Sequence, residues 1–598
     1  MPDLSVFRAA LALAGTLIFV MPCSALSGRV LGVGDGRGIG QAAVTLSLPA
    51  ATPGPATVTV FTDADGRYRF PDLAAAPPAG STLVAHKLGY RMPAAAVDAS
   101  AGATLLLAAA ADVAEQVPAS AWLGLMPPGD MRNVLVTSCT SCHQVPSPRM
   151  RDFAAQIEAV RGGPDGDAKA LAAWRKVVRH EAWRAMVKYM RTRHYAIFPD
   201  ESAMNLDAVD WPTALNPDYN FFTARQGEMI AKFLADHFPH STASLPPDGY
   251  VYGAPLGVTA KTVIREYAFP NTALVRELVP APGSPYLWGA DVQRSLIVRL
   301  DPATGDTRWY PVSFEGSTGP HTIAPDDAGK LWVSMVDNGQ FGRFDPDTER
   351  WTLWTLRPSN LPPSASLATA ALVHDMSIDE RGHVSRDPQG RIWLTLVGSN
   401  QLGTIAPDTG EVAFHAASQR EGLSAINHLI YSVVLSPDGQ CAWYSQVNGD
   451  VACLDTASAK PSRKIEFPEG AGPRRMMRDG AGQLWVALFG SGQVTRIDMQ
   501  RGERTATYDL PDRAAAPYAV AWDENRKRLW VVTANADAIY RLDPARGEFA
   551  VFPLPRRMAF LRQLGVDHAS GRLIGTYANY PAGSGPSYAF VIDVGDEP

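Results

Sequence analysis

The sequence predicts a multidomain, mainly β protein in which a β-sandwich, a small all-α domain and a seven-bladed β-propeller follow one another. Short alternating strands fill the first part of the chain, and amphipathic helical patterns fill the next. An aromatic strand then recurs at intervals of about 45 residues. The predicted divisions are a signal peptide at 1–25, the sandwich at 26–115, the all-α domain at 118–240 and the propeller at 255–598.

The first 25 residues have the pattern of a secretory signal peptide. Arg8 precedes the apolar run Ala9–Val20, and the small residues Cys23-Ser24-Ala25 form a cleavage site. The run is too short to span a bilayer, which needs roughly 20 residues. We therefore expect a periplasmic protein whose mature chain begins at Leu26.

The segment from Leu26 to Val113 alternates short apolar strands with turns, which is typical of an antiparallel β-sandwich. The stretch Thr62–Tyr68, followed by Gly89-Tyr90, resembles the regulatory-like domain of carboxypeptidases, a module without catalytic residues. This resemblance implies a spacer or docking role.

The stretch Cys139-Thr140-Ser141-Cys142-His143 has the spacing of a c-type haem attachment site. The two thiols would bond the haem vinyl groups, and His143 would supply the proximal iron ligand. A structural zinc site would need a second ligand pair, and the chain has no other Cys-x-x-Cys. The motif thus predicts one covalent haem c.

The residues after this motif resemble single-haem cytochrome c modules of bacterial periplasmic enzymes. The run from Trp183 to Met190 is similar to their W-x-x-x-V-x-x-M pattern, whose last Met binds iron, so the resemblance implies Met190 as the sixth ligand. The chain departs from these modules by an aromatic insert, Thr192–Phe222, expected to cover the haem edge or contact the next domain. The sixth position therefore also stays open to Met186, His180 or His194, or to a vacancy.

Two further cysteines, Cys441 and Cys453, flank the hairpin signal Asn448-Gly449. If Val447 lies opposite Asp450, the two cysteines point to opposite faces of the sheet. A loop one residue longer would bring them to the same face, where they could form a disulfide. The strand register therefore decides whether the disulfide can form, and the sequence does not determine this register.

The repeat of the third domain is an aromatic strand, mostly Leu-Trp, with Ile574 in the seventh place; the other copies are centred on Trp288, Trp332, Trp393, Trp443, Trp485 and Trp530. Such a repeat is typical of a β-propeller. The last unit ends at the strand Tyr588–Asp593, and a lone strand, Val263–Phe269, precedes the first unit. We expect the lone strand to pair into the last blade and close the ring.

The repeats Gly319–Ile323 and Gly472–Arg475 resemble the G-P-H/R strand of the streptogramin (virginiamycin B) lyase family. That resemblance implies a seven-bladed propeller, and an activity in which histidines, an acidic residue and magnesium break a lactone C–O bond. The acidic position after the Trp strand is empty in every repeat here. This departure makes magnesium doubtful.

The inner strands of the propeller begin with polar residues that would ring its axis. Arginine binds carboxylates with a fork of donors, and histidine exchanges protons near neutral pH, so the set suits an anionic or phenolic substrate. The candidate catalytic residues are Arg276, His321, His374, His428, Arg474, Tyr518 and Arg562, with His383 and Tyr431 as alternatives to the second and third histidines.

We expect a periplasmic oxidoreductase in which haem c passes electrons from a small substrate or redox partner to a cytochrome or cupredoxin. A streptogramin-type lyase and a non-enzymatic electron-transfer scaffold are the alternatives. The net charge of -6, without a basic block, argues against nucleic acid as a partner.

Overall fold

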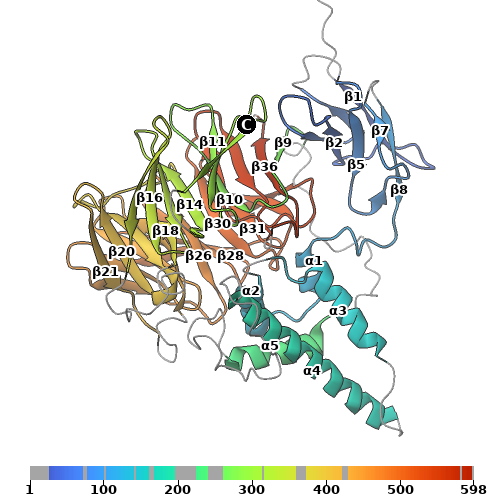
Figure 1. Ribbon diagram of the computed structural model, residues 1–598. Coiled ribbons are helices and arrows are strands. Elements are labelled where there is room, and N and C mark those ends of the chain that lie inside the picture. The colour runs from blue at the N-terminus through green and yellow to red at the C-terminus, as the bar shows by residue number, and fades with distance from the viewer. Residues whose placement is uncertain are drawn as a thin grey trace, which may run out of the picture.

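The computed structural model describes residues 26–71, 77–99, 103–140, 143–160, 168–195, 224–239, 260–312, 316–357, 372–420, 428–579 and 582–595. Three predicted features lie outside these residues: the signal peptide, Cys142 and most of the aromatic insert. Within them, the protein is mainly β. Figure 1 shows a ring of sheets with the N-terminal strands beside it and the helices below it.

The N-terminal strands form two sheets that enclose a core of Val30, Leu46, Val60, Leu83 and Leu105. The first sheet has the order β4-β1-β8-β6, with β1 at Ser27–Gly32, β4 at Arg67–Arg69, β6 at Tyr90–Arg91 and β8 at Thr104–Ala109. The second contains β2 at Ala43–Ser47, β3 at Thr57–Phe61, β5 at Thr82–His86 and β7 at Val97–Asp98.

The described helices follow in one segment: α1 at Ala119–Gly124, α2 at Asp130–Cys139, α3 at Pro148–Ala159, α4 at Ala168–Tyr195 and α5 at Ala224–His237. Trp183 of α4 is buried between Phe153 and Phe238, with ring centroids 5.4 and 4.7 Å away. An ion pair of 2.7 Å between Arg184 and Glu228 also joins α4 to α5. Of the helices described, none combines the length and apolar character needed to cross a membrane.

The remaining strands form seven four-stranded antiparallel units, which confirms the predicted number of blades. The first three are β10 (Val275–Pro280), β11 (Leu287–Asp291), β12 (Leu296–Leu300), β13 (Thr307–Pro311); β14 (Pro320–Pro325), β15 (Leu331–Met335), β16 (Gln340–Asp345), β17 (Arg350–Thr355); and β18 (Val373–Met376), β19 (Ile392–Leu396), β20 (Gln401–Ala406), β21 (Glu411–Ala416). The next three are β22 (Ile430–Leu435), β23 (Cys441–Gln446), β24 (Val451–Asp455), β25 (Pro461–Ile465); β26 (Pro473–Arg478), β27 (Gln483–Leu488), β28 (Gln493–Asp498), β29 (Glu503–Asp509); and β30 (Pro517–Asp523), β31 (Arg528–Thr533), β32 (Ala538–Asp543), β33 (Glu548–Pro553). The seventh contains β34 (Leu564–Asp567), β35 (Arg572–Thr576), β36 (Tyr588–Asp593) and β9 (Val263–Ala268).

The repeated tryptophans lie on the second strands and are buried between blades. In three blades the indole N–H donates to an aspartate at the preceding turn, which satisfies a buried donor that would otherwise be costly. Three blades share this bond at 2.9, 2.8 and 2.9 Å: Trp332 with Asp326, Trp393 with Asp387 and Trp485 with Asp479.

The lone strand β9 closes the ring, as predicted, by pairing along β36 from Ala268 opposite Tyr588 to Val263 opposite Asp593. Its other edge pairs with β3 of the N-terminal sheets, with Thr57 opposite Glu266. The seventh blade and one N-terminal sheet therefore form a single eight-stranded sheet. Nothing in the sequence analysis indicated this second pairing.

Glu266 lies at the centre of this junction and is fully buried. Its carboxylate accepts hydrogen bonds from the hydroxyl groups of Thr57 at 2.6 Å and Tyr577 at 2.7 Å. The Arg556 guanidinium donates to both carboxylate oxygens at 3.0 Å. A buried carboxylate persists only when it is paired and hydrogen-bonded in this way.

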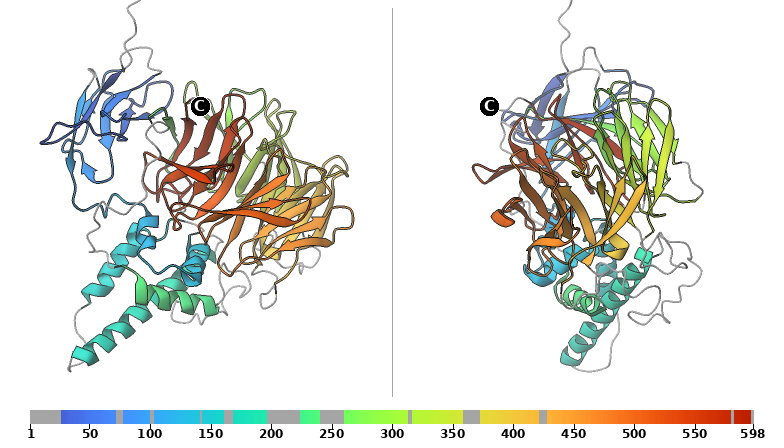
Figure 2. Two further views of the ribbon diagram at one scale, coloured as in Figure 1. Left: turned by 180° about the vertical axis from the view of Figure 1, so that it is seen from behind. Right: turned by 90° about the vertical axis from the view of Figure 1, so that its left-hand side faces the viewer.

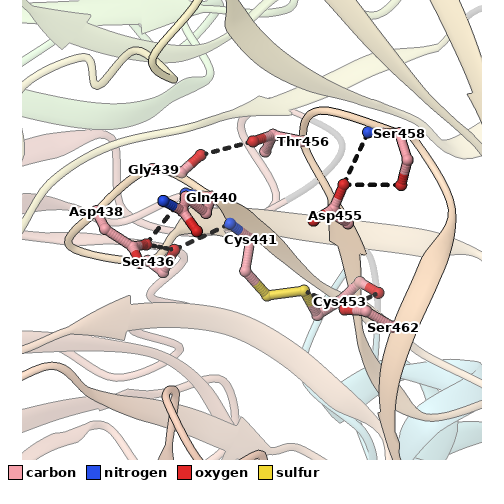
Figure 3. The surroundings of a disulfide bond; sticks show 10 residues. All are labelled: Ser436, Asp438, Gly439, Gln440, Cys441, Cys453, Asp455, Thr456, Ser458 and Ser462. Atoms are coloured by element: carbon pink, nitrogen blue, oxygen red, sulfur yellow. Dashed lines mark hydrogen bonds between the residues drawn. A yellow bond between two sulfur atoms is a disulfide. The ribbon is translucent and has the colours of Figure 1, made fainter.

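Cys441 and Cys453 form a disulfide between β23 and β24 (Figure 3). Cys453 lies opposite Trp443, and the Gln446 amide donates to the Asp450 carbonyl at 3.0 Å. The connecting loop is thus one residue longer than the tightest hairpin. This is the register that brings both cysteines to the same face.

We predict that Glu266→Gln destabilises the protein by roughly 1.5–3 kcal/mol, because the partly buried Arg556 guanidinium loses its charged hydrogen-bond partner. The denaturant midpoint measures the effect. Glu349→Gln is the matched control, since Glu349 pairs with Arg308 at the surface and such pairs contribute about 1 kcal/mol or less. Equal losses in the two variants would contradict the role assigned to Glu266.

Candidate functional site

The candidate site is formed where the inner strands of the blades begin. In six blades the pairing between the inner and second strand shifts register at this point, as between Pro473 and Met476 in β26. Such bulges redirect side chains and are common beside functional sites. The side chains gathered here, called the mouth ring below, are Arg276, His321, His374, Tyr431, Arg474, Tyr518 and Arg562.

Consecutive members of the mouth ring contact one another. Arg276 Nη1 lies 2.8 Å from His321 Nε2, and the His321 ring lies 4.2 Å from the His374 ring. The ring centroids of His374 and Tyr431 lie 4.1 Å apart, and His374 Nδ1 is 2.9 Å from the Tyr431 carbonyl oxygen. These residues form one continuous row of polar and aromatic groups.

The row continues through two tyrosines. The hydroxyl groups of Tyr431 and Tyr518 are hydrogen-bonded to each other, and Arg562 donates from Nη1 to the Tyr518 hydroxyl at 3.0 Å. Arg474 lies over the rings of Phe489, Tyr518 and Tyr431, at 3.8, 4.9 and 5.1 Å from their centroids. Aromatic faces stabilise a buried guanidinium through their quadrupoles.

The mouth ring is covered by the helical segment. Arg474 Nη2 donates to the Thr137 carbonyl of α2 at 3.3 Å, and all members except the half-buried Arg276 are at most 7% exposed. The sequence analysis expected these side chains to face an open mouth. The structure corrects this expectation, because a separate segment of the chain covers them.

For two blades the sequence left two candidate residues each, and the structure shows where each candidate lies. His374 and Tyr431 belong to the mouth ring, whereas His428 lies before β22 and its ring accepts a hydrogen bond from the Arg420 amide. His383 lies beyond the other end of its inner strand, with Nδ1 2.8 Å from Asp327 Oδ1. In this blade Tyr431 is the residue that contacts other members of the mouth ring, and the catalytic role predicted for His428 stays a prediction.

The charges of the ring act on its titratable groups. Burial lowers the pKa of His321 and His374 well below the ordinary value, and neighbouring arginines lower it further. Burial raises the pKa of Tyr518, but the charges of Arg562, Arg474, Arg276 and Arg475 outweigh this and lower it to about 7. Burial and the charge of Tyr518 raise the pKa of Tyr431. We infer that the hydrogen-bonded tyrosine pair releases one proton near neutral pH.

A second buried cluster lies next to the ring and was missed by the sequence analysis. Arg475 pairs with Glu277 at 2.5 Å and with Asp375 at 3.5 Å, and it donates to the Thr322 hydroxyl at 2.9 Å. Burial raises the pKa of Glu277 to about 7. The adjacent pair Arg474-Arg475 is the sequence signal that could have indicated this cluster. The bulge in β26 lets these two consecutive side chains reach different partners.

The predicted haem-attachment motif lies beside the mouth ring. Thr137 of α2, which ends at Cys139, donates to the Gly470 carbonyl at 3.0 Å. A Cβ added at Gly490 would lie 2.3 Å from the Thr137 hydroxyl, so the helix packs directly on backbone. Beyond the motif, Gln144 donates to Asp537 at 2.7 Å. The motif is thus held against the propeller from both sides.

The described residues of the motif fit a haem. His143 Nδ1 lies 2.8 Å from the Gln144 carbonyl oxygen, which leaves Nε2 for a metal, as in most metal-binding histidines. Burial lowers the pKa of His143, and the charge of Arg562 lowers it further, which favours the neutral form that binds metal. Cys139 is partly buried. The hydroxyl of Thr140 is buried without a hydrogen-bond partner among the described residues.

The candidates for the sixth iron ligand are not distinguished by the structure. Met190 is 39% exposed, whereas Met186 packs against the core of the helical segment. His180 lies 3.7 Å from Glu181, and the side chain of His194 is outside the described residues. Met190 stays a prediction. For magnesium, the described residues contain no cluster of three or more His, Cys, Asp or Glu side chains.

Comparisons with known proteins give partial similarities. No family model matches the chain. Regucalcin of Danio rerio is 28% identical over 135 residues, which are 21% of this chain and 44% of that protein, so the match spans less than half of its length. The structure of virginiamycin B lyase from Staphylococcus aureus has 16% identity and a TM-score of 0.45, covering 55% of this chain and 99% of that one. A streptogramin B lyase structure has 15% identity and a TM-score of 0.44, covering 56% and 97%. The propeller itself is established by the strand pairings described above.

We predict that a tyrosinate signal appears near pH 7 and is lost in Tyr518→Phe. The folded pKa of Tyr518 is about 7, below the ordinary value of about 10, so the charged form stabilises the fold at alkaline pH. This contribution disappears as the pH falls through about 7. Ultraviolet resonance Raman spectroscopy detects tyrosinate selectively. An unchanged signal in the variant, or its loss in a Tyr540→Phe control, would contradict the assignment.

Proposed function

We propose that this protein is a periplasmic c-type cytochrome with oxidoreductase activity. Cys139 and Cys142 would hold one covalent haem c, His143 would be its proximal ligand, and Met190 is the proposed sixth ligand. Residues 118–240 would then form the cytochrome c domain, and the N-terminal sheets a carboxypeptidase regulatory-like module. The electron acceptor would be a periplasmic cytochrome or cupredoxin.

One observation carries this proposal: the helix that ends in the attachment motif contacts the mouth ring. Arg474 contacts α2 directly, and the charge of Arg562 reaches His143. A haem domain that served only as a tethered carrier would not need to place its motif on the axis of the propeller. The arrangement supports a role for the propeller in tuning or supplying the electron centre.

The residues of the chain would divide the work as follows. A bound haem c supplies single-electron exchange. The Gln144 carbonyl orients the His143 imidazole, and burial keeps that imidazole neutral and available as a ligand. The guanidinium groups of Arg474 and Arg562 would favour the reduced form of a haem bound there, because positive charge in a desolvated site stabilises added negative charge. Tyr518 can hold or release a proton beside them.

The streptogramin-type lyase is the less well supported alternative. Its chemistry would require a substrate to reach the histidines of the mouth ring, and α2 covers this end of the propeller. The non-enzymatic electron-transfer scaffold remains compatible with the same geometry. Turnover of a reducing substrate by the purified protein, followed as haem reduction, separates the scaffold from the oxidoreductase.

We predict that replacing both Cys139 and Cys142 by Ala abolishes haem that survives denaturation, because no thiol then remains in the motif to form a thioether bond. Haem staining on denaturing gels measures it. The matched control is Cys441→Ala, which removes a thiol of the disulfide and should retain the stain. A stained band of normal intensity in this double variant would refute the haem assignment.

We also predict that Arg562→Gln lowers the midpoint potential of the haem by tens of millivolts, because it removes a positive charge that acts on His143. Spectroelectrochemical titration measures the potential. Arg546→Gln is the control, since Arg546 pairs with Glu548 at the surface. An unchanged or raised potential in Arg562→Gln would argue against coupling between the propeller axis and the haem.

A further inference from the structure

A cavity of about 580 Å³ opens at the other end of the inner strands, away from α2. It lies among three turns, at residues 281–285, 380–383 and 567–569. This volume is typical of small-molecule sites, which occupy about 300–1,000 Å³. None of the functions considered so far uses it.

The walls of the cavity are mostly apolar. They include Val279, Ile378, Met477 and Leu564, together with the ring of Trp522. Trp522 is held in place, because its indole N–H donates to Glu524 at 2.6 Å and its ring stacks on Trp485 at 6.0 Å. These walls suit the apolar body of a ligand and offer it a preformed surface.

Two polar side chains that line the cavity have unsatisfied hydrogen-bonding atoms among the described residues. One is the Nε–H of Arg475, a donor, and the other is the Oε1 of Gln563, an acceptor. Buried polar atoms without partners are uncommon and call for an explanation. A hydroxyl group can accept from one and donate to the other, which a hydrocarbon or a carboxylate cannot do.

The charges at the floor of the cavity argue for a neutral ligand. Glu277 and Arg475 both line the cavity and pair with each other at 2.5 Å. An anionic ligand would lie beside the Glu277 carboxylate, and a cationic ligand beside the Arg475 guanidinium. Either would compete with an existing buried pair, and the penalty for a poorly compensated buried charge is large.

We propose that this cavity binds a small neutral alcohol or phenol with an apolar body, whose hydroxyl group bridges Arg475 and Gln563. This site is separate from the mouth ring and does not depend on the haem assignment. The cavity lies at the opposite end of the inner strands from the residues predicted to bind substrate. We therefore expect the small ligand to bind at the open end of the propeller.

The test is isothermal titration calorimetry of the full protein with cinnamyl alcohol, cinnamylamine and cinnamate, which share one apolar body and differ in the polar group. We expect the alcohol to bind at least about tenfold more tightly than either charged compound. Gln563→Leu should lower the affinity for the alcohol roughly 3- to 10-fold, because one hydrogen bond is lost. Gln493→Leu, the same change at the surface of β28, should leave binding unaltered.

A second variant covers the case in which Gln563→Leu does not fold. Ile378→Trp adds bulk to the cavity wall and should abolish binding of the alcohol while circular dichroism stays unchanged. The proposal is overturned if the alcohol produces no heat of binding, if cinnamate or cinnamylamine binds as tightly, or if folded variants at both positions bind like the wild type. These outcomes require no haem reduction, so the cavity and the haem assignment can fail separately.

Discussion

Four guanidinium groups are buried or half-buried at the axis of this propeller, and the structure depends on how their charges are compensated. Arg475 has two carboxylates, Arg562 has the Tyr518 hydroxyl and the Ala578 carbonyl, and Arg474 has aromatic faces and the carbonyl of Thr137. Desolvated charges without such partners would unfold the centre of the ring. Because Thr137 belongs to α2, the helical segment takes part in stabilising the propeller rather than resting on it.

The bulges at the starts of the inner strands give the axis two chemically different ends. In β26, consecutive arginines have separate partners: Arg474 contacts the helical segment, and Arg475 lines the cavity at the open end. Three residues lie near both groups: Thr322 bonds to Arg475 and to Glu277, and His321 contacts Arg276 of the mouth ring. The two ends therefore communicate through a short series of buried polar contacts, and a change of protonation at one end alters the field at the other.

Much of the architecture could be predicted from the sequence, because it rests on local patterns. The Trp repeat predicted the number of blades, and the lone strand Val263–Phe269 predicted how the ring closes. Contacts between distant segments could not be predicted: neither the pairing of β3 with β9 nor the covering of the mouth ring by α2 leaves a periodic signal. For the same reason the sequence left His428 and Tyr431 as alternatives, since the strand pattern does not determine where the inner strand of that blade begins.

The eight-stranded sheet has a consequence for how the protein is made. Strand β3 pairs with β9, and β9 pairs with β36, so three strands from widely spaced parts of the chain must meet in one sheet. During synthesis, β3 emerges long before β9, and β9 long before β36. Each has an unpaired edge during that interval, the kind of surface through which incomplete chains associate. A chaperone that shields strand edges would therefore act on this protein before the ring closes.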